Sequence, residues 1–434
     1  MAGNDEVVLA REDDCNEWSA KSRSATLFCA LNFGKPTKSI NFTRLISNYL
    51  KLRMRKLLNV LVVLMAMMLA ACGEPEPTPD PTPDPDVEEQ DKLYPDELYP
   101  AVEDRVVISY VTYYGTSIPD VRYMTHINYA FAELVVEDGV YQSFKLQGKT
   151  SRFQQIVNLK QKKPDLKILL SFTHGTSDDQ YTEQNPFGGF SAMAKSDTDR
   201  KKFAQDCLDF CKEWGIDGID IDWEFPGMSW SKDIAYDTSC DVENYTLLMK
   251  QLRETLGDDY LLTYAGYVFD MQNISGGGSR YINIAAVDPY VDWVNIMTYN
   301  MTSVAHSALN NPKLWVDCKR AVKHYTDKGI APSKLVLGVP FFGWGEVTWS
   351  YKNIISKDKT QYKIDNWDAA SSVPYVTEIA TGERLCAYDN PKSIVMKGDF
   401  ARGVGLKGMM SWQYDQDDAK RSLNTAMWQA TMKK

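Results

Sequence analysis

The chain has 434 residues, of which 44% are hydrophobic and 24% are charged, and its formal net charge is −10. This hydrophobic fraction is near the globular average and excludes wholesale disorder. The acidic balance argues against nucleic acid as the main partner, because phosphate binding needs clustered Lys and Arg. The 8 Cys show no regular spacing, which indicates neither a disulfide-dense scaffold nor a zinc site.

The first part of the chain has features of a secretion signal in the right order. Met54-Arg55-Lys56 opens a short basic region, and an almost wholly apolar run follows over residues 57–71. This run is shorter than the about 20 residues of a comfortable membrane span. It ends in Leu69-Ala70-Ala71-Cys72, which resembles the lipidation sequence of bacterial lipoproteins. The resemblance implies a signal peptide over residues 54–72 and lipidation of Cys72. A short buried helix that ends in an ordinary Cys is the alternative.

The segments on either side of this signal look unlike a folded domain. Residues 1–53 show no clear periodic pattern, and we interpret them as an upstream extension, with Met54 as the true start. Residues 73–103 begin with alternating Pro and acidic residues, which predicts a stiff, extended tether. An ordinary disordered terminus would look much the same. Together with the lipidation sequence, the tether predicts anchoring to the bacterial cell envelope, and we expect the outer membrane, on its periplasmic or surface face.

From about Val102 onward, short β-branched or aromatic runs alternate with longer amphipathic stretches, which predicts repeated βα units. Helix-like stretches include residues 200–214, 242–256 and 314–328, the last ended by Gly329. Eight units within residues 104–434 fit a TIM (β/α)8 barrel, an α/β fold. An open, doubly wound sheet is the alternative, because periodicity alone does not close a barrel. The eight runs are residues 106–110, 126–131, 167–172, 218–222, 260–265, 293–298, 334–340 and 408–412.

One interval between the predicted strands is longer than a helix needs. Residues 341–406 separate the seventh and eighth runs and contain several strand-like pieces. We interpret them as a small insertion subdomain of the barrel, placed on the face where barrel active sites lie. We expect it to supply part of a cleft wall.

The fourth run and the two residues after it carry three carboxylates at alternate positions. In a strand, alternate side chains share a face, so Asp220, Asp222 and Glu224 point one way and the apolar residues between them point the other. The apolar set packs on the helices of a barrel, so the acids face its interior. Neighbouring carboxylates raise one another's pKa, which keeps a proton available near neutral pH. A solvated edge strand or a metal site is the alternative, although three in-line acids without a nearby His make a poor transition-metal site.

Residues 217–224 resemble the Asp-x-x-Asp-x-Asp-x-Glu signature of family 18 glycoside hydrolases, which comprise the chitinases and related endo-β-N-acetylglucosaminidases. Four further segments resemble the second, sixth, seventh and eighth barrel strands of that family, in the right order. The resemblance covers nearly all of residues 102–434 and nothing before them. The four segments are His126-Ile-Asn-Tyr-Ala-Phe131, Asn295-Ile-Met-Thr-Tyr-Asn300, Leu337-Gly-Val-Pro-Phe-Phe-Gly343 and Gly408-Met-Met-Ser-Trp412.

The resemblance implies retaining hydrolysis without a protein nucleophile, in which the 2-acetamido carbonyl of the substrate attacks the anomeric carbon. It implies that Glu224 is the general acid and then the base that activates water. Asp222 would orient the acetamido N–H, and Asp220 would share a proton with Asp222. Tyr299 would donate a hydrogen bond to the acetamido carbonyl, and Trp412 would form the floor under the distorted sugar. Further substrate contacts that the resemblance implies are Tyr110, Phe131, Met297, Asn300 and Trp344.

Two segments depart from the family pattern. The third strand ends in Ser171-Phe-Thr-His174, where family members usually have Ser-x-Gly-Gly, so Thr173 and His174 should reshape that wall of the cleft. Asn300 stands where many chitinases have Asp, which removes a charge near the acetamido group. These changes leave the preferred glycan open. Three loop tryptophans line outer subsites or cap a core, namely Trp230, Trp344 and Trp349.

The leading hypothesis is an endo-acting hydrolase that cleaves β-1,4 bonds of N-acetylglucosamine-containing glycans, with chitin favoured over N-glycan cores. The alternatives are an endo-β-N-acetylglucosaminidase on N-glycan cores, a catalytically silent glycan-binding lipoprotein and a purely structural lipoprotein. Silent family members typically lose the acid that Glu224 supplies here. We expect no cofactor or metal, since the sequence has no phosphate loop, dinucleotide fingerprint or metal cluster. The expected partners of this monomer are the glycan and, through the lipid anchor, a membrane.

Overall fold

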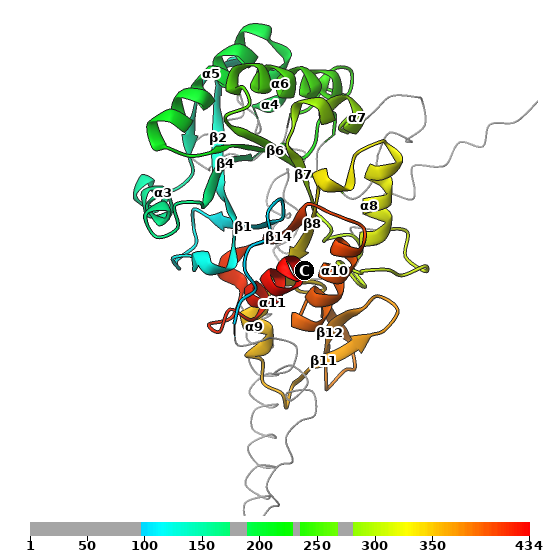
Figure 1. Cartoon of the computed structure of the whole chain (residues 1–434). Helices are drawn as coiled ribbons and strands as arrows, with labels where there is room; N and C mark the ends of the chain where they lie inside the picture. Colours follow the sequence, from blue (N-terminus) through cyan, green and yellow to red (C-terminus); the bar gives the residue numbers. More distant parts are fainter. Residues whose placement is uncertain (1–96, 174–188, 229–234, 268–280) are drawn as a thin grey trace, which may run out of the picture. The chain divides into compact units, whose positions relative to one another are not determined.

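The computed structural model describes residues 97–173, 189–228, 235–267 and 281–434, all within the unit Thr82–Lys434 (Figure 1). The predictions for residues 1–96, including the signal peptide and Cys72, lie outside the described residues. Those for His174 and Trp230 do as well. In the described ranges, no helix combines the length and the apolar character that crossing a membrane requires.

Eight parallel strands form a closed barrel. Their order is β1-β14-β8-β7-β6-β5-β4-β2, and β1 also pairs with β2, so the sheet closes on itself. This closure confirms the predicted TIM barrel and excludes the open, doubly wound sheet. The strands are β1 (Val106–Thr112), β2 (His126–Glu137), β4 (Lys167–Thr173), β5 (Gly218–Asp222), β6 (Leu261–Gly266), β7 (Trp293–Ile296), β8 (Leu335–Pro340) and β14 (Gly408–Trp412).

Two of the helices around the barrel begin directly after residues whose side chains cap them. The helix α5 starts at Asp197, three residues before the predicted start, because the side chain of Ser196 accepts a hydrogen bond from the Asp199 N–H. The helix α8 starts four residues later than predicted, because the Asp317 side chain caps it. The helices are α3 (Thr150–Val157), α4 (Phe190–Lys195), α5 (Asp197–Trp214), α6 (Asp241–Leu256), α7 (Ile284–Val287), α8 (Cys318–Asp327), α10 (Pro391–Gly403) and α11 (Ser422–Met432).

Two features of the first units differ from the predicted repeat. The connection between β1 and β2 contains only the 3-10 helix Val121–Tyr123 in place of an α-helix. The strand β2 continues past the barrel and pairs antiparallel with an extra strand, β3 (Val140–Leu146). The hairpin turns at Asp138 and Gly139, whose φ angles of 49° and 78° suit the tight turn that an Asp-Gly pair favours.

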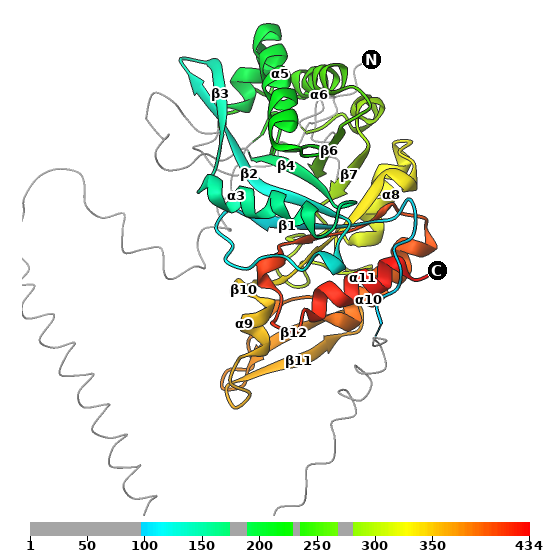
Figure 2. The same cartoon turned by 60° about the vertical axis from the view of Figure 1, so that its left-hand side comes forward.

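The insertion between β8 and β14 contains a five-stranded antiparallel sheet of order β10-β9-β13-β12-β11. The helix α10 follows this sheet and packs against α11 beside β14. In both views the sheet lies on the side of α10 and α11, away from α5 and α6 (Figure 1 and Figure 2). The insertion comprises β9 (Phe342–Gly345), β10 (Trp349–Ser350), α9 (Tyr351–Ile355), β11 (Tyr362–Asp368), β12 (Val373–Glu378) and β13 (Arg384–Ala387).

The apolar face of β5 packs into the core between the barrel and the helices. Ile219 and Ile221 are fully buried. The ring of Trp223 stacks on Phe190 of α4, with centroids 5.2 Å apart and planes 8° apart. This packing fixes the alternation along β5, so the intervening carboxylates face the barrel interior as predicted.

Residues 97–102, which the sequence assigns to the tether, lie against α11. The Tyr99 N–H donates to Oε1 of Gln429 at 2.8 Å, and Nε1 of Trp428 donates to the Tyr99 carbonyl at 2.8 Å. Leu98 and Val102 are half-buried against the core. The described part of the chain therefore begins as a strap that joins the entrance of β1 to the C-terminal helix.

Candidate active site

Asp220 is fully buried inside the barrel and accepts four hydrogen bonds from side chains of four other strands. Burial raises the pKa of Asp220 and the four hydrogen bonds oppose that shift. Both carboxylate oxygens of Asp220 are thus held in place at the base of the site. The donors are Tyr110 Oη at 2.8 Å, Ser171 Oγ at 2.7 Å, Thr263 Oγ1 at 2.6 Å and Asn295 Nδ2 at 3.1 Å.

Asp222 and Glu224 form a coupled pair at the carboxyl end of β5. Burial raises the pKa of Asp222 well above its ordinary value, and the charges of Glu224 and Asp220 and a hydrogen bond with Glu224 raise it further. Two carboxyl groups in contact cannot both ionise at low cost, so the pair retains a proton. Asp222 is 6% exposed, whereas Glu224 is half-buried. The accessible member of the pair is therefore the one that can exchange a proton with a bound molecule.

Tyr299 follows β7 and lies beside these acids. Burial raises its pKa well above the ordinary value, and the charges of Asp222 and then Glu224 add to the shift. The hydroxyl therefore stays protonated and can donate a hydrogen bond. Gly338 on β8 leaves room for the ring, because a Cβ there would lie 3.1 Å from Tyr299 Cε1 and 2.4 Å from the Ile296 carbonyl oxygen.

Three aromatic rings from β1, β2 and β14 adjoin one another next to the acids. The ring of Trp412 lies 5.5 Å from Tyr110, and it stacks on Phe131 with centroids 5.6 Å apart and planes 25° apart. Trp412 and Phe131 are half-buried, and Tyr110 connects the group to Asp220 through its hydroxyl. Non-proline cis peptide bonds adjoin Phe131, Glu224 and Trp412. The group offers an apolar surface of the kind that packs on a sugar ring.

The remaining candidates lie at the rim on the side of β7 and the insertion. Met297 is buried two residues before Tyr299, and Asn300 follows Tyr299 with a φ of 52°. Trp344 of β9 is half-buried, with its ring 6.0 Å from that of His306. The face of Trp349 is occupied by Nζ of Lys357, 3.5 Å from the ring centroid, so this ring is packed within the insertion. The structure thus brings the acids, Tyr110, Tyr299, Phe131 and Trp412 together, with Trp344 farther out.

The sequence did not indicate two further residues, Tyr267 beside Glu224 and His306 beside Asn300. Tyr267 directly follows β6, and burial together with the charge of Glu224 raises its pKa to about 12. Its position after the strand next to β5 could have indicated it. His306 contacts Asn300, Phe342 and Trp344, but it lies in an irregular stretch after β7 where no periodic pattern points to it.

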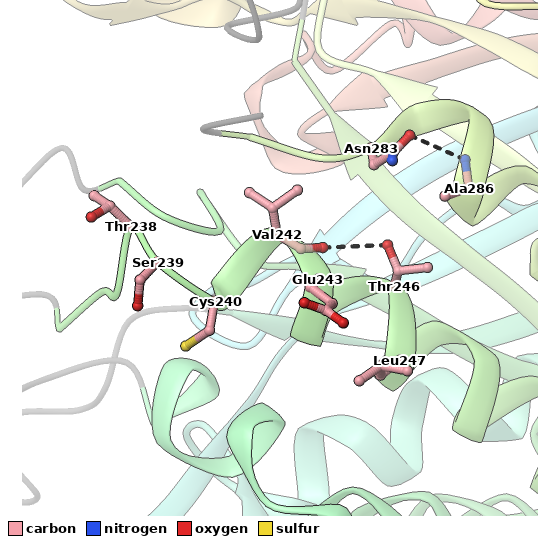
Figure 3. A pocket seen from close by; sticks show the side chains of 9 residues that line it. All are labelled: Thr238, Ser239, Cys240, Val242, Glu243, Thr246, Leu247, Asn283 and Ala286. Carbon is pink, nitrogen blue, oxygen red and sulfur yellow. Dashed lines mark hydrogen bonds between the residues drawn. The ribbon is translucent and has the colours of Figure 1, made fainter. Parts of the chain in front are cut away.

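A separate pocket of about 510 Å³ lies at the start of α6 (Figure 3). Asp220, Asp222 and Glu224 do not line this pocket, so it is not the site at which these acids would act. Within the described ranges, no group of three or more His, Cys, Asp or Glu is arranged to hold a metal ion. The pocket is lined by Thr238, Ser239, Cys240, Val242, Glu243, Thr246, Leu247, Asn283 and Ala286.

Comparison with known proteins assigns the chain to a family. The family model described as "Glycosyl hydrolases family 18" matches residues 106–417, which span the barrel and the row of acids. The chain belongs to glycosyl hydrolase family 18. The matched range includes Asp220, Asp222 and Glu224, which lie on β5 and just after its end.

Relatives of this family 18 glycoside hydrolase include several chitinases. Chitinase A1 of Niallia circulans is 29% identical over 326 residues, which cover 62% of this chain and 43% of the relative. Class V chitinase CHIT5 of Lotus japonicus is 26% identical over 336 residues, with 70% of this chain and 80% of the relative covered. The match to Chitinase 63 of Streptomyces plicatus covers 49% of that protein. The chain therefore spans about half the length of Chitinase A1 and of Chitinase 63.

Solved structures agree on the fold. A family 18 N-acetylglucosaminidase from Paenibacillus barengoltzii is 25% identical and has a TM-score of 0.62, with 75% of this chain and 99% of that chain covered. The group IV chitinase of Ostrinia furnacalis has a TM-score of 0.61 at 22% identity. The second likeness concerns the fold alone.

Proposed function

We propose that this family 18 glycoside hydrolase is an endo-acting enzyme that cleaves β-1,4 bonds of N-acetylglucosamine-containing glycans, with chitin or chitooligosaccharides as substrate. The observation that carries the proposal is the coupled pair of Asp222 and Glu224 at the carboxyl end of β5. A carboxyl pair in which the pKa of one member is raised, so that the protonated form is favoured, suits an acid that must protonate a glycosidic oxygen.

The proposed reaction has two steps. In the first, Glu224 protonates the leaving glycosidic oxygen while the carbonyl oxygen of the substrate's 2-acetamido group attacks the anomeric carbon. The bond to the leaving sugar breaks, and a cyclic oxazolinium ion forms. In the second step, Glu224 takes a proton from water, and the water oxygen attacks the anomeric carbon and opens the ring. The product keeps the anomeric configuration, and Glu224 regains its proton.

The neighbours of Glu224 fit supporting roles in this reaction. Asp222 would accept a hydrogen bond from the acetamido N–H and stabilise the positive charge that develops on the ring. Tyr299, whose burial keeps its hydroxyl protonated, would donate to the acetamido carbonyl. The half-buried ring of Trp412, stacked on Phe131, would support the sugar at the cleavage site.

Product analysis tests the proposal. Purified residues 87–434, with Glu224→Gln and Glu243→Gln variants, would be incubated with chitin oligosaccharides and with a high-mannose glycoprotein, and the products weighed by mass spectrometry. We expect short chitooligosaccharides from the unchanged protein and from Glu243→Gln, whose exposed side chain lies on α6. Glu224→Gln should lower the rate roughly 100- to 10,000-fold while oligosaccharide binding persists.

Other outcomes of that experiment would change the assignment. Release of an intact glycan from the glycoprotein would assign the enzyme to endo-β-N-acetylglucosaminidases that act on N-glycan cores. Binding without cleavage of either substrate would favour a silent glycan-binding protein. Efficient cleavage of a polymer that lacks the 2-acetamido group would remove the substrate-assisted mechanism.

We also propose that the enzyme is a lipoprotein of the bacterial cell envelope, anchored through Cys72. The support is the order of a basic start, an apolar run, Leu69-Ala70-Ala71-Cys72 and an acidic Pro-rich segment. Cell fractionation of the full chain and of Cys72→Ala tests it. The full chain should partition with membranes and the variant should not, and identical fractionation would exclude the anchor.

A further inference from the structure

The turn that carries Tyr299 is held by two side chains that bind the backbone of Asn300. The Asn300 N–H donates to Nδ1 of His306 at 3.3 Å, and the Asn300 carbonyl accepts from the Tyr267 hydroxyl at 3.4 Å. The Met301 N–H donates to the His306 carbonyl at 3.1 Å and closes the loop from His306 back to the turn. Both polar groups of the Asn300 backbone are therefore fixed from outside the turn.

The backbone at Asn300 needs such support. Its φ of 52° lies in the left-handed region, which Asn tolerates better than most residues but which still costs free energy. Residues in this region persist where their surroundings over-determine them. The adjacent Tyr299 side chain lies beside Asp222 and Glu224, so the turn decides where its hydroxyl points.

The His306 ring is built into the structure as a neutral acceptor. It is fully buried, and its centroid lies 5.2 Å from that of Phe342 and 6.0 Å from that of Trp344. Burial, assisted by the charge of Lys397, lowers the pKa of His306 to about 3, and a polar contact with the Phe342 backbone opposes this shift. Because Nδ1 accepts the Asn300 N–H, the proton of the neutral imidazole is assigned to Nε2, which is buried and has no partner with hydrogen-bond geometry among the described residues.

The same ring connects the turn to the insertion. Phe342, which contacts His306, also packs edge-on against Tyr299, with ring centroids 5.9 Å apart and planes 75° apart. The ring of Tyr299 is thus bounded by β9 on one side and by the His306-supported turn on the other.

We propose that His306 is a positioning residue for Tyr299, which fixes the Asn300 turn through Nδ1 and so holds the Tyr299 hydroxyl at the acids. This inference rests on the proposed hydrolysis only for its kinetic consequence. Because the His306 side chain is fully buried, it cannot contact a substrate. It therefore acts through the Asn300 turn.

Two substitutions separate the acceptor from the ring. His306→Asn keeps an acceptor near the position of Nδ1 and loses the ring, whereas His306→Phe keeps the ring contacts and loses the acceptor. With a chitin oligosaccharide, we expect His306→Phe to lower kcat about 10- to 100-fold, as a displaced catalytic group does, with KM changed less than about threefold. His306→Asn should stay within about threefold of the unchanged enzyme. His324→Asn on α8 is the matched control and should leave both constants unchanged.

A double-mutant cycle with Tyr299→Phe distinguishes positioning from general damage. If His306 acts through the Tyr299 hydroxyl, His306→Phe should change kcat by less than about threefold in the Tyr299→Phe background, because coupled residues are not additive. Equal losses in both backgrounds, or equal losses in His306→Phe and His306→Asn, would overturn the proposal.

A spectroscopic measurement tests the geometry whether or not the enzyme cleaves the chosen glycan. In the ¹⁵N spectrum of histidine-labelled full-length protein at pH 7, the signal that His306→Asn removes should be that of a neutral ring protonated on Nε2. A ring protonated on Nδ1, or on both nitrogens, would overturn the proposal even in an active enzyme. Absence of cleavage with the expected spectrum would refute the proposed function and leave the hydrogen bond to Asn300 supported.

Discussion

Asp222 is a residue at which function and stability are opposed. Its pKa is raised by burial and by the charges of Glu224 and Asp220, so the folded state binds its proton more tightly than the unfolded chain does. The unfolded chain gives up this proton near the ordinary Asp pKa of about 3.9. Stability is therefore lost as the pH rises from that value through the raised pKa of the folded state.

Replacing Asp222 by Asn should remove this penalty. We expect Asp222→Asn to raise the Tm at pH 7 to 8 by roughly 1–3 °C, because the domain is larger than the 150–250 residues for which about 1 kcal/mol produces about 2–4 °C. The gain should shrink as the pH falls and should vanish below about 4, where the carboxyl becomes protonated in the unfolded state as well as in the folded state. Differential scanning calorimetry across this pH range measures it, and activity should fall at every pH.

The control for this measurement is Asp237→Asn. Hydrogen bonds from Ser239 and Lys195 lower the pKa of Asp237, so its charged form is favoured in the folded state. This substitution should not raise the Tm at any pH. A gain that is independent of pH in Asp222→Asn would contradict the assignment of the penalty to ionisation.

The row of acids was predictable from sequence, but its partners were not. Alternation along β5 is a local property, which is why Asp220, Asp222 and Glu224 could be placed on one face from spacing alone. The donors that hold Asp220 come from four other strands, 43 to 110 residues away along the chain. His306 is similar, because its role depends on a turn and on an insertion strand that no local pattern joins.

At the scale of the strands, glycines allow neighbouring strands of the barrel to approach one another closely. A Cβ on Gly218, the first residue of β5, would lie 2.1 Å from the Leu261 carbonyl oxygen of β6. The nearest obstacle is backbone, which cannot rotate away as a side chain can. Any side chain at this position must therefore move β5, which carries the acids.

We expect Gly218→Ala to lower the free energy of unfolding by roughly 1–3 kcal/mol, as overpacking does. Activity should fall as well, because Asp220 moves with the strand. Gly403→Ala is the matched control: nothing lies within 4 Å of a Cβ there, and the residue ends α10. That change should be neutral or stabilising by about 0.4–1 kcal/mol. Urea unfolding of both variants gives the comparison, and similar stabilities would refute the close approach at Gly218.

The positions of the elements followed from sequence better than their ends did. The strands β5 and β14 occupy the predicted residues 218–222 and 408–412, because their apolar runs are bounded by glycine or by a change of residue type. The predicted start of α8 was too early. The amphipathic pattern extends back to residue 314, but the Asp317 side chain caps the helix and fixes its start at Cys318. The 3-10 connection after β1 has too few residues of helical pattern to form an α-helix.

At the scale of the whole molecule, the two ends of the barrel are fastened together. Beside the two contacts of Tyr99, Nε2 of Gln429 donates to the Glu97 carbonyl at 2.8 Å. The guanidinium of Arg105 donates to the Thr431 carbonyl at 3.0 Å. Composition alone could not predict this strap. Its residues directly follow a Pro-rich segment and show no periodic pattern of their own. Its partners lie 326 to 332 residues away.

This strap predicts where the folded domain begins. A protein that starts at residue 104 loses the three hydrogen bonds of Glu97 and Tyr99 with α11, and it leaves the polar atoms of Gln429 and Trp428 without these partners. At about 1 kcal/mol for each hydrogen bond, its Tm should be roughly 5–10 °C below that of a protein starting at residue 87. A protein that starts at residue 96 keeps the strap and should melt with the longer one. Equal melting of all three would instead assign residues 97–103 to the tether, as composition suggests, and place the start of the stable domain at the entrance of β1.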